Sequence, residues 1–147
     1  MRMIRAAISS LPFATYPPTV IAMEDSDMML DWKHYRKELA AGVMRLATLS
    51  PETVKGYTAL STAGQRKNVL GAKTRELIAL AVAVTVRCDG CIAVHTEAAQ
   101  RLGASEDELA EALGVAVAVN AGATVVYSTR VMDAVAQSAQ AIAQDLP

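Results

Sequence analysis

The chain has 147 residues, of which 52% are apolar, 20% charged and 4% aromatic. This is enough for one domain with its own core and too little for two sizeable domains. The 14 Lys and Arg against 15 Asp and Glu give a formal net charge of -1, so no positive surplus is available to bind nucleic acid or an anionic membrane. Because 28 residues are alanine, the strongest helix former, we expect an all-α protein without a nucleic-acid or membrane partner.

Residues 1 to 30 are expected to form a tail, and residues 31 to 147 a helical domain. Arg2 and Arg5 precede a mildly apolar stretch, but serines and prolines interrupt it and no small-residue cleavage site follows, which argues against a secretory signal. The longest apolar runs, at 77–86 and 113–126, are shorter than the roughly 20 residues that cross a membrane. We therefore expect a cytoplasmic protein.

Two helices are predicted at the start of the domain. Asp31 can cap a segment whose apolar residues recur at three- and four-residue steps: Trp32, Tyr35, Leu39, Val43 and Leu46. Ser50, Pro51 and Glu52 form a second helix start. Inward-facing positions would follow at Val54, Tyr57 and Leu60, before Gly64 ends the helix and a polar connection runs from 65 to 71.

The second half of the domain is also predicted to be helical. Residues 73–86 alternate like a strand at the valines, but their alanines and length favour a buried helix. A helix from Cys91 to Leu102 should end at Gly103. Ser105 and Glu108 then have the spacing of a capping box for the next helix.

The final helical region is expected to be interrupted. Asn120, Ala121 and Gly122 predict a break or kink, followed by a last helix from Thr124 to about Ala143. Its apolar stripe would comprise Val125, Tyr127, Val131, Val135 and Ile142.

The segment Arg87 to His95, RCDGCIAVH, contains the residues best suited to chemistry. Cys88 and Cys91, the 2 cysteines of the chain, would have Cα atoms about 5 Å apart at a helix start, within disulfide reach. Free amides and the helix dipole stabilise a thiolate there. His95, one turn after Cys91, can exchange a proton near neutral pH. A local pair without other cysteines favours redox chemistry over a structural disulfide.

Glu76 is a candidate partner of this segment. It precedes Cys88 by twelve residues, roughly 18 Å along a straight helix. A helical hairpin that turns near residues 86 and 87 would instead place Glu76 beside residues 95 to 98. Glu76 would then meet His95 before either sulfur, which predicts proton movement from Glu76 to His95 to Cys91.

Three segments, KTRELIAL at 73–80, RCDGCIAVH at 87–95 and LGA at 102–104, resemble the carboxymuconolactone decarboxylase and AhpD-like superfamily. The resemblance covers about residues 31 to 136. It implies an AhpD-like all-helical fold that assembles as a homo-oligomer, either a trimer or a hexamer. For members with a C-x-x-C-x-x-x-H motif, it implies reduction of hydroperoxides or disulfides, with Glu76, Cys88, Cys91 and His95 as catalytic residues.

The same resemblance implies an external dithiol reductant, either lipoyl or thioredoxin-like. We expect no cofactor. We also expect no metal, because three ligands spread over two turns of one helix rarely converge tetrahedrally. AhpD itself has a histidine directly before the second cysteine, where this chain has Gly90.

Several alternatives are open. A lyase related to carboxymuconolactone decarboxylase could use Glu76 and His95 on a small organic acid. A non-enzymatic subunit could use the dithiol to switch its oligomeric state. Zinc could bind Cys88, Cys91, His95 and Glu76, or the cysteines could be two small buried residues beside a capping histidine. A thioredoxin-like fold is not favoured, because strand-like segments are too few and no proline follows Gly103 until Pro147.

Overall fold

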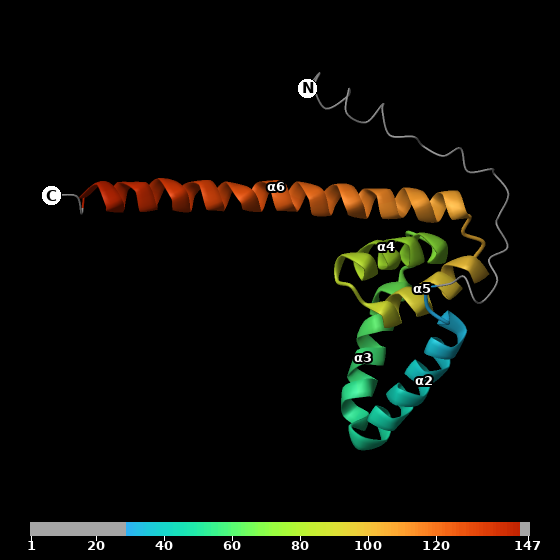
Figure 1. Ribbon diagram of the computed structural model, residues 1–147. Coiled ribbons are helices and arrows are strands. Elements are labelled where there is room, and N and C mark those ends of the chain that lie inside the picture. Colours follow the sequence, from blue (N-terminus) through green and yellow to red (C-terminus); the bar gives the residue numbers. More distant parts are fainter. Residues whose placement is uncertain (1–28, 145–147) are drawn as a thin grey trace. The chain divides into compact units, whose positions relative to one another are not determined.

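The computed structural model describes residues 29–144, and the chain divides into two units, Met1–Asp31 and Trp32–Pro147. The predicted tail therefore lies almost entirely outside the described residues. Across residues 29–144 the structure has 5 α-helices, one short 3-10 helix and no strand (Figure 1). The all-α prediction is confirmed for this part of the chain.

Apart from the break expected near Asn120, the helices begin and end close to the predicted positions. Their bounds are α2 Trp32–Leu49, α3 Pro51–Ala63, η2 Gly64–Arg66, α4 Ala72–Thr85, α5 Asp89–Arg101 and α6 Glu106–Gln144. The region that could have been a strand is thus the helix α4. In the second unit, α2 packs against α3 and α5, while α4 packs against α5 and α6.

The buried core lies where α4 packs against α5 and against α6. Its buried apolar residues are Leu80, Ala83, Ala93, Ala99 and Ala116. Since four of the five are alanines, the helix backbones can approach closely, as the composition predicts. Most large apolar side chains in residues 29–144 are instead exposed.

The prediction that one apolar face of α3 points inward is wrong. Tyr57 and Leu60 are 67% and 76% exposed, and only Val54 is partly buried. The helix does begin at Pro51 after the N-cap Ser50, but the Ser50 hydroxyl pairs with the Thr53 hydroxyl at 2.8 Å rather than with a backbone amide. The start signal is therefore local, whereas burial depends on which helix lies opposite.

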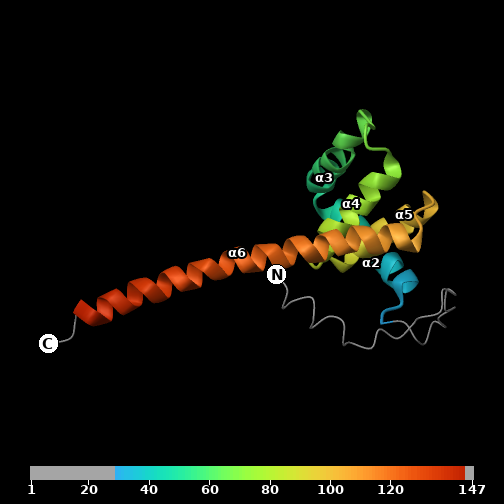
Figure 2. The ribbon, with the colours of Figure 1, turned by 90° about the horizontal axis from the view of Figure 1, so that it is seen from above.

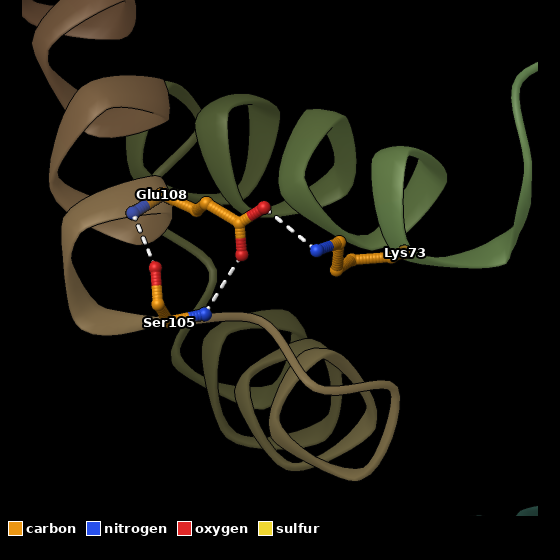
Figure 3. Close-up of polar contacts among 3 residues, drawn as sticks. All are labelled: Lys73, Ser105 and Glu108. Carbon is orange, nitrogen blue, oxygen red and sulfur yellow. Dashed lines mark hydrogen bonds and ion pairs between the residues drawn. The ribbon is translucent and has the colours of Figure 1, made fainter.

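The N-terminus of α6 has the predicted capping box, shown in Figure 3. The Ser105 N–H donates to Glu108 Oε2 at 2.8 Å, and the Glu108 N–H donates to Ser105 Oγ at 3.1 Å. Lys73 at the start of α4 also donates to Glu108 Oε1 at 2.6 Å. The hydrogen bond from Lys73 and the backbone hydrogen bond from Ser105 lower the pKa of Glu108. One carboxylate therefore caps α6 and ties it to α4.

The expected break at Asn120 to Gly122 is wrong, because α6 is one continuous helix of 39 residues. Asn120 Nδ2 donates to the Ala116 carbonyl at 2.7 Å and to Thr85 Oγ1 at 2.9 Å. The Thr124 hydroxyl donates back to the Asn120 carbonyl at 2.9 Å. These polar groups are satisfied along the helix or on α4, so they do not need to interrupt it.

Beyond Asn120 every residue of α6 is exposed as far as Gln144. Figures 1 and 2 both show this orange-to-red half of the helix running beyond α4 and α5. Between residues 29 and 144, α6 is the one helix long and apolar enough to cross a membrane by length and composition, with a window of mean hydropathy 1.7 that is 6% buried. The lengths of the uninterrupted apolar runs did not predict a helix of this length and composition. The continuous helix α6 joins the run at 113–126 to the apolar residues after it.

Candidate active site

Cys88 joins the end of α4 to the start of α5. The Cys88 N–H donates to the Ala83 carbonyl at 3.0 Å, and the Arg87 N–H donates to the Val84 carbonyl at 3.3 Å. Arg87 lies in the left-handed region, with φ of 55°. These features define a Schellman motif, which ends α4 and reverses the chain. The predicted turn near residues 86 and 87 is therefore confirmed.

The same Cys88 is the N-cap of α5. Its carbonyl accepts from the Ile92 N–H at 2.9 Å, and its Sγ accepts from the Cys91 N–H at 3.2 Å. Because its backbone is extended, with φ of -102° and ψ of 93°, Cys88 precedes the helix rather than sharing its face with His95. Only Cys91 and His95, four residues apart, are stacked on one side of α5.

Cys88 and Cys91 form a disulfide, with Cα atoms 5.3 Å apart. This agrees with the separation expected from the helical rise. Both cysteines are partly buried, and they lie at the positive end of the α5 dipole. Reduction of the bond would give two thiols beside free first-turn amides, where a thiolate is stabilised.

Glu76 and His95 lie side by side across the α4–α5 hairpin. Glu76 Oε2 and His95 Nδ1 are 2.7 Å apart, with side chains 20% and 34% exposed. A proton on Nδ1 is donated to the carboxylate, which leaves Nε2 as the second ring nitrogen to exchange a proton. The juxtaposition predicted from the hairpin is present in the structure.

Helix α2 covers the turn between the cysteines, a feature that the sequence does not reveal. A Cβ on Gly90 would lie 3.2 Å from Leu39 Cδ2, so the glycine allows α2 to approach closely. Farther along α5, Arg36 Nε lies 3.0 Å from Glu97 Oε2. Leu39 and Arg36 thus fix α2 beside the disulfide, and the absence of a side chain at Gly90 has a packing reason.

Across residues 29–144, no group of three or more His, Cys, Asp and Glu side chains is arranged to hold a metal ion. The side chains that the site brings together are two sulfurs, one imidazole and one carboxylate.

Comparisons with known proteins agree with the fold. Residues 51–134 match the model of the carboxymuconolactone decarboxylase family. An uncharacterized protein of Haemophilus influenzae is 49% identical over 107 residues, covering 73% of this chain and 95% of that protein. An uncharacterized protein of Cupriavidus necator is 29% identical over 105 residues, covering 71% of this chain and 93% of its own length.

A solved structure is also similar. The apo form of a carboxymuconolactone decarboxylase family protein from Legionella pneumophila superposes with a TM-score of 0.59 at 32% sequence identity, covering 76% of this chain and 95% of that one. The family match includes α4, α5 and all four predicted site residues. The chain belongs to the carboxymuconolactone decarboxylase family.

Proposed function

We propose that the protein is a thiol oxidoreductase that reduces hydroperoxides or disulfides through Cys88 and Cys91. The observation that carries the proposal is the Cys88–Cys91 disulfide at the start of α5. This disulfide joins residues three apart at a helix N-terminus and is partly exposed. A reductant can therefore reach it and reduce it with two electrons. The Glu76–His95 pair on the adjoining turn supplies a group that moves protons.

The half of the cycle that reduces the hydroperoxide and oxidises the protein starts from the dithiol. The Cys91 thiolate attacks the terminal oxygen of the hydroperoxide, the O–O bond breaks, and Cys91 becomes a sulfenic acid. The alkoxide leaves as an alcohol after it takes a proton from His95. The Cys88 thiolate then attacks Cys91 Sγ, the S–O bond breaks, and hydroxide leaves as water with a second proton. The net change is one disulfide, one alcohol and one water from one hydroperoxide and two thiols.

Cys91 is assigned as the attacking residue because His95 follows it by one helical turn. Glu76 accepts the Nδ1 proton of His95 and so orients the ring, which keeps Nε2 available to receive the thiol proton. A disulfide substrate follows the same order: Cys91 forms a mixed disulfide, a thiolate leaves, and Cys88 resolves the intermediate.

The cycle closes with an external dithiol that delivers two electrons and two protons to the Cys88–Cys91 bond. A lipoyl group or a thioredoxin-like protein has this chemistry, and a reducing compartment such as the cytoplasm keeps such dithiols available.

Turnover of a hydroperoxide with dihydrolipoamide tests the proposal. Cys91→Ser should abolish peroxide consumption, whereas reduced Cys88→Ser without the external dithiol should consume one equivalent of hydroperoxide and leave a sulfenic acid that dimedone traps at Cys91. The two variants are matched controls, because each removes one sulfur from the same turn. If the dimedone adduct forms on Cys88 in the Cys91→Ser protein, the roles are reversed. If both variants keep full turnover, the redox function is wrong.

A further inference from the structure

Arg87 is an exposed cation directly before the disulfide. Neighbouring Cα atoms are about 3.8 Å apart, so its side chain begins close to Cys88. Across residues 29–144, no ion pair and no side-chain hydrogen bond involves Arg87. The guanidinium can therefore contact a molecule that approaches Cys88, because no group of the described chain binds it first.

The other charged side chains beside the disulfide already have a compensating charge. Glu76 and His95 bind each other at 2.7 Å, and Arg36 forms an ion pair with α5 at 3.0 Å. Asp89 is exposed, but it lies in the first turn of α5, where the positive end of the helix offsets part of its charge. The positive charge left for a ligand at the disulfide is that of Arg87.

The backbone of Arg87 has a conformation that glycine adopts more easily. Its φ of 55° lies in the left-handed region, and the corresponding residue after α5 is Gly103, with φ of 76°. A side chain with a Cβ costs stability in this conformation, and such residues cluster at sites where the side chain has a role. The geometry of the turn does not require arginine, whereas a role beside Cys88 does.

We propose that Arg87 determines the specificity of the reductive step, by selecting a dithiol that carries a carboxylate near its sulfurs. This selection rests on the proposed function and names the chemical class of its reductant. A guanidinium binds a carboxylate through two parallel hydrogen bonds, so the bound dithiol would be held with a thiol at Cys88. Dihydrolipoate has this chemistry, and dihydrolipoamide is the same dithiol without the charge.

The reduction consists of two thiol–disulfide exchanges. One thiol of the bound dithiol gives its proton to His95 and attacks Cys88 Sγ. The Cys88–Cys91 bond breaks, and Cys91 leaves and takes the proton from His95. The second thiol of the reductant then attacks the reductant sulfur of the mixed disulfide, and Cys88 leaves and takes up the proton that this thiol loses. The reductant becomes a cyclic disulfide, and the protein gains two electrons and two protons.

Reduction of the disulfide in the oxidised full-length protein, without hydroperoxide, tests this selection. Dihydrolipoate and dihydrolipoamide are compared at low salt, with thiol alkylation at timed intervals, and the measured quantity is the ratio of their second-order rate constants. An exposed guanidinium–carboxylate pair is worth about two- to fivefold, so Arg87→Gln should lower the ratio by that factor, while Arg87→Lys should keep it above the value for Arg87→Gln. In 1 M salt, where the Debye length is about 3 Å, the wild-type ratio should fall to that of Arg87→Gln.

Two further variants separate the position of the charge from its amount. Lys67→Gln removes a positive charge before the other end of α4, a helix of 14 residues or about 21 Å, and should leave the ratio unchanged. Asp89→Asn removes a negative charge beside Cys88 and should raise the ratio. Arg87→Gln keeps a Cβ in the left-handed turn, so its Tm should match that of the wild type.

The outcomes distinguish the role of Arg87 from the redox function. Equal ratios in wild type and Arg87→Gln, or an equal fall in Lys67→Gln, would overturn the role of Arg87 while the disulfide is still reduced. A Cys88–Cys91 disulfide that neither dithiol reduces would overturn the proposed function, and the selection of a reductant with it.

Discussion

Arg87 should be replaceable by glycine with a gain in stability. Its φ of 55° lies in the left-handed region, which costs a residue with a Cβ about 1–2 kcal/mol. Glycine removes that cost but loses about 0.5–1 kcal/mol more conformational entropy on folding. The net gain for Arg87→Gly is therefore about 0.5–1 kcal/mol, equivalent to about 2–4 °C in Tm for a unit of this size.

The second Schellman motif of the chain supplies the control. Gly103 has φ of 76° and follows α5 with the same hydrogen-bond pattern, in which the Ala104 N–H donates to the Ala99 carbonyl at 3.0 Å. Gly103→Ala should lower the free energy of unfolding by about 1 kcal/mol, because it places a Cβ in the left-handed region that Arg87→Gly relieves. Thermal unfolding followed by circular dichroism at one protein concentration measures both variants. Loss of stability in Arg87→Gly would refute the assignment of strain to this turn.

Three further predictions concern packing and pH. Leu80 is the largest side chain of the buried core, so Leu80→Ala should cost about 2–5 kcal/mol in urea unfolding, and a cost near zero would contradict its burial. Gly90→Ala should gain about 0.5–1 kcal/mol of helix propensity in a Leu39→Ala background and less in the wild type; equal effects in a double-mutant cycle would show that Leu39 does not crowd Gly90. The lowered pKa of Glu108 means that its contribution to stability is present above the unfolded value of 4.5 and is lost as pH falls through the folded value. Lys73→Met should therefore flatten the acid limb of the stability curve below pH 4.5, and an unchanged limb would exclude the ion pair as its cause.

The sequence predicts those parts of the structure that depend on neighbours along the chain. Gly103 ends α5, and Ser105 with Glu108 begins α6, because each signal acts through hydrogen bonds over a few residues. The Glu76–His95 contact was also predictable, since it requires only two helices and a turn of known position.

Features that depend on distant residues could not be predicted. The importance of Gly90 appears only when Leu39, far earlier in the chain, is found against it. Asn120 looks like a helix breaker until Thr85 accepts its amide proton. The exposure of Tyr57 has the same origin, because periodicity identifies an apolar face but does not identify what lies opposite it.

The central claim is that Cys88 and Cys91 cycle together between dithiol and disulfide. Intact-mass analysis of fully reduced protein, after one equivalent of hydroperoxide and then thiol alkylation, measures this directly. The account predicts that the protein loses two hydrogen atoms, gains no oxygen, and has both cysteines protected from the alkylating agent. Stable addition of oxygen to one sulfur while the other is still alkylated, or alkylation of both, would contradict it.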